Sequence, residues 1–253
     1  MEPDFASLTF FFPMWNEEEM IQRTVAAARE TGDNLLADGV LGDYDILLVN
    51  DASTDGTAKI ADDLAAADDR VRVVHHEVNR GLGGSVRTGL ASASSELVLY
   101  TDADMPFDLQ DLRKALRLMS VYEADIVSAY RFDRTGEGAK RALYSYVYNS
   151  MVKALFRLRI RDVNFAFKLI RRNVLEHTEL VSDGSFIDVE LLAKAQRRGF
   201  YIIQFGVDYF PRARGTSSLS SPRVIIDIIR ELAQLLPSVR ATKRLPDFVR
   251  TRR

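Results

Sequence analysis

Short apolar runs alternate with longer helical stretches through the first half of the chain, and this alternation constrains the fold most. Each run is too hydrophobic to leave one face in water, which is typical of parallel strands covered on both sides. The intervening stretches repeat apolar residues at helical spacing. The pattern predicts a doubly wound α/β sheet with helices on both faces. The predicted strands are Leu8–Phe12, Tyr44–Val49, Val71–His75, Leu97–Thr101 and Ile126–Tyr130, and the predicted helices are Glu17–Arg29, Thr57–Ala67, Gly83–Ala93 and Asp108–Met119.

The second half is less regular. A last helix should be capped by Ser221, begin at Pro222 and end at Pro237. We find no repeat and no clear linker, so one domain is expected: residues 1–220 form its body, and residues 221–253 add an amphipathic helix and a basic tail. The other predicted elements are helices over Lys140–Leu158 and Asp188–Arg198, and strands over Phe165–Leu169 and Tyr201–Phe205.

The composition excludes several classes of protein. Of 253 residues, 47% are hydrophobic and 28% charged, unlike a disordered or collagen-like chain. Cysteine is absent, which excludes disulfides, thiolate zinc sites and thiol nucleophiles. The three histidines lack metal-ligand spacing, and His75-His76 fits a strand end. No apolar run approaches the roughly 18 residues of a membrane span, and Met1–Asp4 is acidic, unlike a signal peptide. A cytoplasmic protein is expected.

The small net charge of −2 conceals an asymmetry. Residues 1–130 carry 24 acidic and 10 basic side chains, whereas residues 131–253 carry 12 and 24. An acidic half suits a metal ion or a solvated surface, and a basic half suits an anionic partner. Because the basic residues are not interleaved with aromatic ones in a recognisable module, no nucleic acid partner is expected.

The strongest single motif is Asp102-Ala103-Asp104, directly after an apolar predicted strand. Side chains two apart on an extended segment point the same way, so both carboxylates should leave the strand end together. Two such like charges repel each other unless a cation lies between them, and Mg²⁺ or Mn²⁺ takes carboxylate, water and phosphate oxygens. The alternative is a cap for the next helix, but Asp108 already fits that role.

Three further polar loops should meet at the same edge of the sheet. An indole such as Trp15 can flank a nucleobase, and Asp51 can accept hydrogen bonds from a base or ribose. Asp55 fits a cap for the following helix. Gly81 and Gly83 permit close backbone approach, with helix-terminal N–H groups directed at an anion. The loops are residues 13–17, 50–57 and 79–83.

In their order and spacing, these motifs resemble glycosyltransferase family 2, the inverting enzymes of the GT-A fold. The resemblance covers about residues 7–220 and implies a GT-A sheet with a smaller, irregular acceptor-side region. The matching motifs are Pro13-x-Trp15-Asn16-Glu17, Val49-Asn50-Asp51-x-Ser53-x-Asp55-Gly56-Thr57, Asn79-x-Gly81 and Asp102-x-Asp104.

The resemblance implies a nucleotide-diphospho-sugar donor, GDP- or UDP-linked, and Mg²⁺ or Mn²⁺ held by Asp102 and Asp104. Asp104 is also a candidate catalytic residue. Pro106 stands where relatives often carry a glutamine that supplements the metal site. The implied donor-binding residues are Pro13, Trp15, Asn16, Glu17, Val49, Asp51, Arg80, Gly81, Asp102, Ala103, Asp104, Arg212 and Arg214.

Within the family, the chain is most similar to polyprenyl-phosphate sugar transferases of the dolichyl-phosphate mannose synthase type. The similarity implies that Arg131, Lys140 and Arg141 bind the acceptor phosphate, with Arg131 also catalytic. The segment 212–217 matches an Arg-x-x-Gly-x-Ser loop expected to close over the diphosphate, although Ser218 replaces a lysine common in relatives. A guanidinium fork pairs well with phosphate oxygens.

A lipid acceptor implies contact with the inner face of the cell membrane. Residues 143–158 and 224–236 have the apolar stripes and basic flanks of helices that lie on lipid, but these stripes fit a core or homodimer contact better. The first alternative is a family 2 enzyme acting on a saccharide or small-molecule hydroxyl, with Asp188 or Glu190 as general base; both residues also fit the first turn of a helix. The second alternative is a nucleotide-sugar-binding protein without catalysis.

Overall fold

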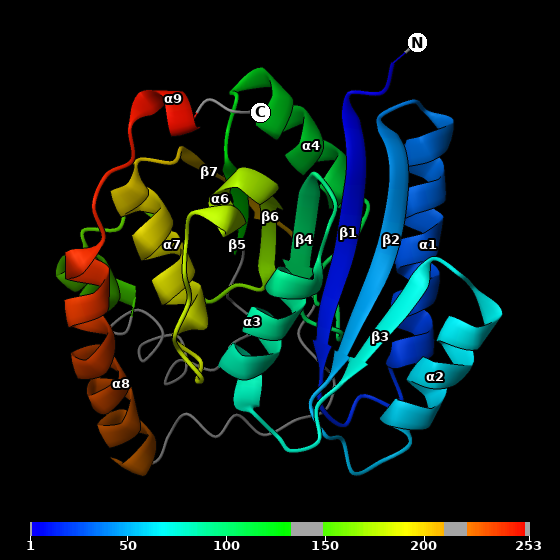
Figure 1. The fold of residues 1–253 in the computed structure, drawn as a ribbon, viewed down its shortest axis with the longest axis horizontal. Coiled ribbons are helices and arrows are strands. Elements are labelled where there is room, and N and C mark those ends of the chain that lie inside the picture. Colours follow the sequence, from blue (N-terminus) through cyan, green and yellow to red (C-terminus); the bar gives the residue numbers. More distant parts are fainter. Residues whose placement is uncertain (1, 133–148, 210–221, 251–253) are drawn as a thin grey trace.

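The strands of the described chain form a seven-stranded, mostly parallel sheet in the order β3-β2-β1-β4-β6-β5-β7 (Figure 1). This computed structural model describes residues 2–132, 149–209 and 222–250. Strand β6 runs antiparallel to both of its neighbours, and the other pairs are parallel. The strands are β1 (Phe5–Met14), β2 (Leu41–Asn50), β3 (Val71–His75), β4 (Leu97–Thr101), β5 (Ile126–Arg131), β6 (Phe167–Arg171) and β7 (Ile202–Val207).

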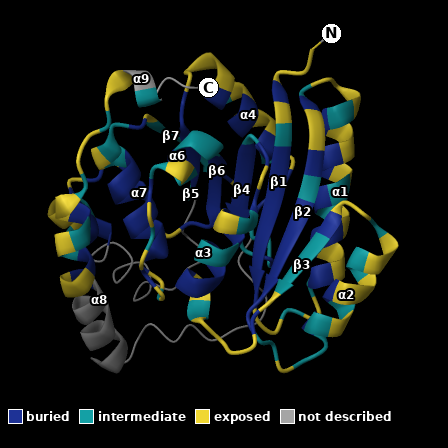
Figure 2. Cartoon of the chain, viewed as in Figure 1, coloured by how far each residue is buried: buried dark blue, intermediate teal, exposed yellow. Residues whose placement is uncertain are grey.

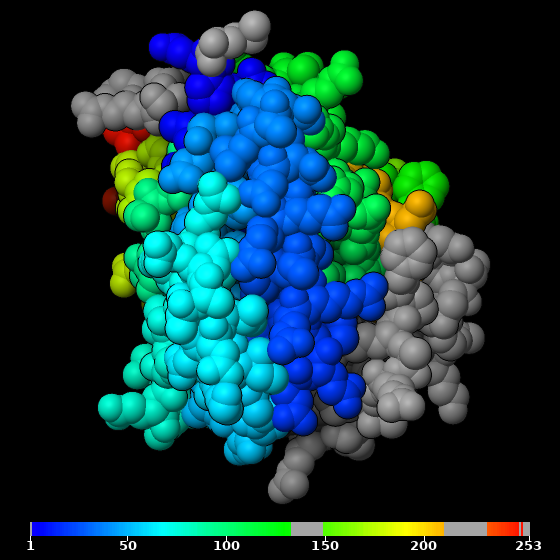
Figure 3. Space-filling model, turned by 90° about the vertical axis from the view of Figure 1, so that its right-hand side faces the viewer, coloured from blue at the N-terminus to red at the C-terminus, as the bar shows by residue number. Residues whose placement is uncertain are grey.

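Helices cover both faces of the sheet, as predicted. One face packs against α1, α2 and α4 and the other against α3, α7 and α8. Seen from the side, α1 and α2 form one flank of the molecule (Figure 3). Residues 149–156 are also helical. The helices are α1 (Ile21–Ala37), α2 (Thr57–Ala67), α3 (Gly81–Ser92), α4 (Asp111–Val121), α6 (Arg172–Glu176), α7 (Ile187–Arg198), α8 (Pro222–Ala241) and α9 (Asp247–Arg250).

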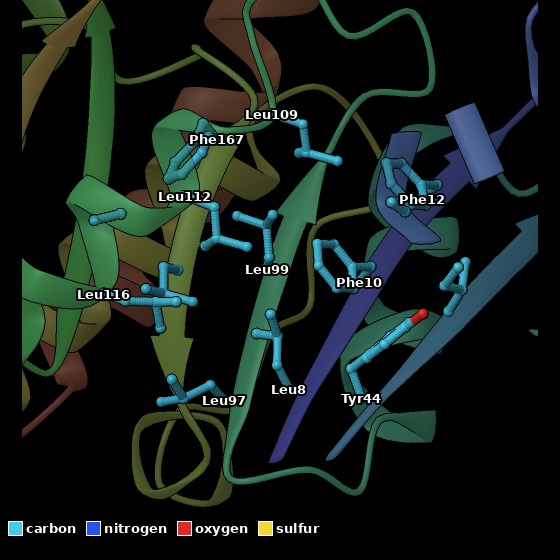
Figure 4. Packing of buried hydrophobic residues seen from close by; sticks show 14 of the residues in the cluster. Leu8, Phe10, Phe12, Tyr44, Leu97, Leu99, Leu109, Leu112, Leu116 and Phe167 are labelled. Atoms are coloured by element: carbon cyan, nitrogen blue, oxygen red, sulfur yellow. The ribbon is translucent and has the colours of Figure 1, made fainter. Parts of the chain in front are cut away.

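The central strands are buried on both faces, which explains their unbroken apolar sequence (Figure 2). Because side chains alternate along a strand, Phe10 and Phe12 point to the α1 side and Phe11 to the α3 side. Phe10 meets Tyr44 edge-on at 5.8 Å between ring centroids, and Phe11 stacks on Tyr100 at 5.6 Å. Figure 4 shows the packing on the side of Phe10 and Phe12, where leucines of β4 and α4 complete the hydrophobic core.

Among the described helices, α1 and α4 begin furthest from their predicted starts. Helix α1 begins at Ile21, because the amides of Met20 and Ile21 both bond to the carbonyl of Glu17 in a preceding turn. Helix α4 begins at Asp111: the carboxylate of Asp108 accepts the Gln110 N–H at 2.9 Å and so caps the turn before the helix.

The predicted end of the last helix is wrong. Helix α8 continues through Pro237 to Ala241. Proline lacks an N–H and disfavours a helix interior, but Leu232, Leu235 and Val239 are buried in the same cluster as α7, and this packing outweighs the lost hydrogen bond. No described helix is both long and apolar enough to cross a membrane. Ser221 and residues 140–148 of the predicted aromatic helix lie outside the described residues.

Candidate active site

The predicted polar loops do meet at one edge of the sheet, where β1, β2 and β3 end side by side (Figure 1). The amide of Asp51 donates to the carbonyl of Met14 at 2.9 Å, and the amide of His76 donates to the carbonyl of Asn50 at 2.9 Å. Because β6 is antiparallel, it begins at this edge, with Phe167 opposite Thr101 of β4.

The first two loops are joined by hydrogen bonds. The amide of Asn16 donates to the Ser53 hydroxyl at 3.0 Å, and Oδ1 of Asn16 accepts the amide of Thr54 at 2.8 Å. Asn16 and Ala52 both adopt positive φ, 56° and 54°, which is costly for residues other than glycine. This arrangement leaves Trp15 56% exposed, as an indole over which a ligand can stack. Pro13 and Val49, in contrast, are buried strand residues paired with each other across β1 and β2.

The predicted cap at Asp55 is confirmed. Its Oδ1 accepts the amide of Thr57 at 3.0 Å and the Thr57 hydroxyl at 2.6 Å, and its Oδ2 accepts the amide of Glu18 at 3.3 Å. Partial burial raises the pKa of this carboxyl, but the hydrogen bonds together lower it by more. The pKa of Asp55 therefore lies below its ordinary value. Asp55 therefore stabilises the start of α2 and the turn before α1.

Asp51 is buried and its carboxylate is held by His76 and by the third loop. Oδ1 lies 2.6 Å from Nδ1 of His76 and accepts the amide of Arg80 at 2.8 Å. The side chain of Asn79 donates to the Asp51 carbonyl at 3.1 Å. Asp51, the predicted base- or ribose-binding residue, thus has a fixed orientation at the edge of the sheet.

The amides of Gly81 and Gly83, at the start of α3, make hydrogen bonds within the protein. The amide of Gly83 donates to the carbonyl of Asp183 at 3.0 Å, and a Cβ on Gly83 would lie 2.4 Å from the carbonyl oxygen of Ser182. The amide of Gly81, whose φ is +71°, donates to Oδ1 of Asn79 at 3.0 Å. The expectation that these two amides face an anion is therefore wrong, because both already have acceptors within the protein.

The Asp102–Asp104 motif lies at the predicted edge but in a different conformation. Strand β4 ends at Thr101, and the next four residues form a turn in which the amide of Met105 donates to the carbonyl of Asp102 at 3.3 Å. Ala103 is buried, and its carbonyl accepts the hydroxyl of Thr24 at 2.5 Å. The extended geometry expected for the two carboxylates is wrong, because the chain turns there. Both remain half-buried at the edge.

A cavity of about 1040 Å³ lies between the start of α1 and this turn. Its lining is strongly acidic, so the anionic diphosphate of a donor would be repelled unless a cation were bound with it. Carboxylate oxygens are the ligands that Mg²⁺ and Mn²⁺ prefer. No group of three or more candidate metal-binding side chains is found within the described residues. The described lining includes the charged residues Glu17, Glu18, Glu19, Arg23, Glu30, Asp55, Asp104 and Asp108.

Arg131, the predicted ligand of the acceptor phosphate, ends β5 and forms a two-pronged ion pair with Asp162. Its Nε lies 2.8 Å and one terminal nitrogen 3.2 Å from the two carboxylate oxygens, and the guanidinium lies over the ring of Tyr209 at 5.3 Å. Asp162 is nearly inaccessible to solvent. The guanidinium is therefore held in one orientation. The predicted residues Lys140, Arg141, Arg212 and Arg214 lie outside the described residues.

Asp188 and Glu190 lie in the first turn of α7, as the structural alternative predicted, and both are buried. Asp188 pairs with Lys168 at 2.7 Å. Burial raises the pKa of Asp188, and the charge of Lys168 lowers it in part. Glu190 accepts the amides of Val181 and Ser182 and pairs with a lysine of the next turn. This burial and pairing disfavour a role for either carboxylate as a general base.

Three residues that organise this region, His76, Asp162 and Lys168, were not predicted as site residues from the sequence. Lys168 gave the clearest available signal, because a lysine within an apolar strand must find a partner when that strand is buried. His76 was interpreted as a strand end, and Asp162 belongs to no recognised motif.

The mostly parallel sheet, the helices on both faces and the acidic turn after β4 define the GT-A class of folds. Solved structures agree. The chain is similar to Mycobacterium tuberculosis glucosyl-3-phosphoglycerate synthase in complex with Mn²⁺, UDP-glucose and phosphoglyceric acid, with 18% identity and a TM-score of 0.66 over 92% of this chain and 80% of that one. It is also similar to residues 1–349 of Staphylococcus aureus TarS in complex with UDP-GlcNAc, with 17% identity and a TM-score of 0.64 over 97% and 69%.

The family model for glycosyl transferase family 2 matches residues 9–178, and the chain belongs to that family. Among curated proteins, it is 31% identical over 243 residues to the glycosyltransferase AglD of Haloferax volcanii, covering 92% of this chain but only 38% of AglD. It is 28% identical over 190 residues to the polyprenol monophosphomannose synthase of Mycolicibacterium smegmatis, covering 71% of each.

Proposed function

We propose that this protein is a metal-dependent, inverting glycosyltransferase that moves a hexose from a nucleotide-diphospho-sugar to a polyprenyl phosphate. Family membership supports glycosyl transfer. The polyprenol monophosphomannose synthase among its relatives supports a lipid phosphate as the acceptor.

The main support for the proposal is that Trp15, Asp51 and the Asp102–Asp104 turn all lie at the same edge of the sheet. An exposed indole and a fixed carboxylate suit a nucleoside, and Asp104 lines the adjoining acidic cavity. Asp102 and Asp104 are the residues that would hold Mg²⁺ or Mn²⁺. When bound, such an ion stabilises negative charge on a leaving diphosphate.

The acceptor side needs little base catalysis under this proposal. A phosphate monoester with a second pKa near about 6 is largely ionised at neutral pH and attacks the anomeric carbon directly. Arg131 would bind this phosphate in the orientation that Asp162 gives it. A hydroxyl acceptor would require a base, and the burial of Asp188 and Glu190 counts against that alternative.

A polyprenyl chain stays in lipid, so the protein would work at the inner face of the cell membrane by peripheral contact. The described part of α8 is an unsuitable contact, because Leu232, Leu235 and Val239 pack inward. Leu155, on the helical segment 149–156, is 41% exposed and is a better candidate.

A two-stage assay tests the proposal. Thermal unfolding is first measured with UDP, GDP, CDP and TDP, each with Mg²⁺, with Mn²⁺ or with chelator. We expect one nucleotide to raise the melting temperature selectively and only with metal, because it binds the native state. The matching sugar nucleotide is then incubated with polyprenyl phosphate or with saccharide acceptors. A glycosylated lipid is the expected product. A glycosylated saccharide, or binding without any product, would refute the proposed reaction.

A further inference from the structure

His76 links Asp51 to helix α3 through both nitrogens of its ring. Nδ1 lies 2.6 Å from Oδ1 of Asp51, and Nε2 lies 2.9 Å from the hydroxyl of Thr88. The side chains of His76 and Asp51 are only 3% and 4% exposed. The neighbouring His75 has a different environment, bonded to the Asn50 side chain and to Asp62 near the surface. Of these two histidines, His76 is therefore the one that supports the Asp51 carboxylate at the edge of the sheet.

The hydrogen-bond pattern fixes which nitrogen of His76 carries a proton. An ionised carboxylate only accepts hydrogen bonds, so Nδ1 must donate to Asp51. The amide of Arg80 donates to the same oxygen. In the neutral ring, Nε2 then accepts the hydroxyl proton of Thr88. Both donors to the carboxylate from the described residues converge on Oδ1, which leaves Oδ2 as the oxygen that can serve a ligand.

We propose that His76 is a positioning residue for recognition of the donor base: it holds Oδ1 of Asp51 so that Oδ2 faces the nucleotide. This inference rests on the proposed function. Only a small part of the Asp51 carboxylate is accessible, so its rotation decides whether an oxygen reaches the ligand at all. A fixed acceptor selects bases with an imino N–H, such as uracil and guanine, over cytosine and adenine, whose equivalent ring nitrogen is itself an acceptor.

Two substitutions of His76 separate positioning from simple structural support. In His76→Asn the amide nitrogen takes the place of Nδ1 and can still donate to Asp51. In His76→Gln the longer side chain places its amide near Nε2, toward Thr88. Both variants replace the ring by a neutral amide. They therefore lose similar packing and differ mainly in which partner they can reach.

The measurement is the dissociation constant of each nucleoside diphosphate with Mn²⁺, and of inorganic diphosphate as a ligand that lacks a base. We expect His76→Gln to bind the preferred nucleotide about tenfold more weakly, as for loss of one hydrogen bond to a charged group. Its discrimination between bases should fall by the same factor. His76→Asn should retain most of both, and affinity for inorganic diphosphate should be unchanged in either variant. Equal effects of the two variants, or an equal loss for inorganic diphosphate, would overturn the inference.

A measurement on the unchanged protein covers the case in which His76→Gln does not fold. The chain has three histidines, so ¹⁵N-histidine labelling gives a spectrum that is simple to assign. We expect the ring of His76 to carry its proton on Nδ1 and to respond to the nucleotide but not to inorganic diphosphate. A proton on Nε2 alone would refute the positioning role. If no nucleotide binds the unchanged protein, the proposed function itself is refuted. If a nucleotide binds but the ring signals of His76 do not change, only this inference is refuted.

Discussion

Replacing Lys168 by methionine should strongly destabilise the protein. Lys168 is fully buried on β6, with its Nζ 2.7 Å from Oδ1 of Asp188 and 2.9 Å from the carbonyl of Phe165. The ammonium also lies over the ring of Tyr100 at 5.5 Å. Methionine fills a similar volume but leaves the carboxylate of Asp188 buried without its cation. Breaking a buried ion pair from one side costs about 3–5 kcal/mol, which corresponds to a fall in melting temperature of about 6–20 °C for a chain of this size.

The loss should depend on pH in a defined direction. Burial raises the pKa of Asp188 above its ordinary value, and Lys168 opposes this shift, so the methionine variant raises that pKa further. A carboxyl with a raised pKa in the folded state is tolerated when protonated and penalised when ionised. The destabilisation relative to the unchanged protein should therefore be smallest near pH 4 and grow as the pH rises toward the raised folded-state pKa.

Urea unfolding followed by circular dichroism at pH 4, 5.5 and 7.5 measures both effects, and a double variant provides the control. In Lys168→Met with Asp188→Leu, neither charge of this pair remains. Its free energy of unfolding should return to within about 1–2 kcal/mol of the unchanged protein, since replacing both partners of a buried pair is often nearly neutral. If the single variant were as stable as the unchanged protein, or if its loss were the same at every pH, the electrostatic explanation would be wrong.

Three further outcomes are expected. Asp104→Asn should lower metal-dependent turnover by about 100-fold or more in an initial-rate assay. Asp108→Asn, which removes a carboxylate from the same cavity, should lower turnover far less. Equal losses would contradict a specific role for Asp104. Gly89→Ala should lower the free energy of unfolding by about 1–3 kcal/mol in urea titration, because its Cβ would lie 2.1 Å from the ring of Phe11; unchanged stability would show that the ring moves easily. Pro237→Ala should raise stability by up to about 3 kcal/mol in the same titration, and a loss would mean that the proline contributes packing.

The sheet could be predicted from the sequence because burial on both faces leaves a local signal. Strands β3 and β4 match the predicted limits at both ends: β4 is buried throughout, whereas β3 is a partly buried edge strand. Strands β1 and β2 extend further than predicted, because residues at their outer ends, such as Ala6 and Gly42, are exposed and carry no apolar pattern. The end of α8 was mispredicted because Pro237 is a strong local signal for the end of a helix. The packing of α8 against residues distant in the sequence, in α7, determines where the helix ends.

The arrangement of the site depends on contacts between residues far apart in the chain. The motifs at residues 13–17, 50–57, 79–83 and 102–104 were located correctly at the sheet edge, because the carboxyl ends of parallel strands must meet there. Nothing near Gly83, however, indicates that the carbonyl of Asp183 occupies its amide. Likewise, the pairing of His76 with Asp51 joins residues from different loops, each of which is ambiguous by itself. A sequence motif thus specifies which residues reach the edge but not which of their polar groups are already used.

The charge asymmetry of the chain persists in the folded protein. Two ion pairs among the described residues join the halves: Arg171 with Glu96, and Arg87 with Asp183. The first takes its cation from the basic half and the second from the acidic half. Together the two pairs therefore leave the difference in net charge between the halves unchanged. The pair of Arg131 with Asp162 lies within the basic half and also leaves its net charge unchanged. Under the proposed function, the acidic cavity would need an added cation to hold a diphosphate, whereas basic residues of the second half, such as Arg131, would attract a phosphate directly.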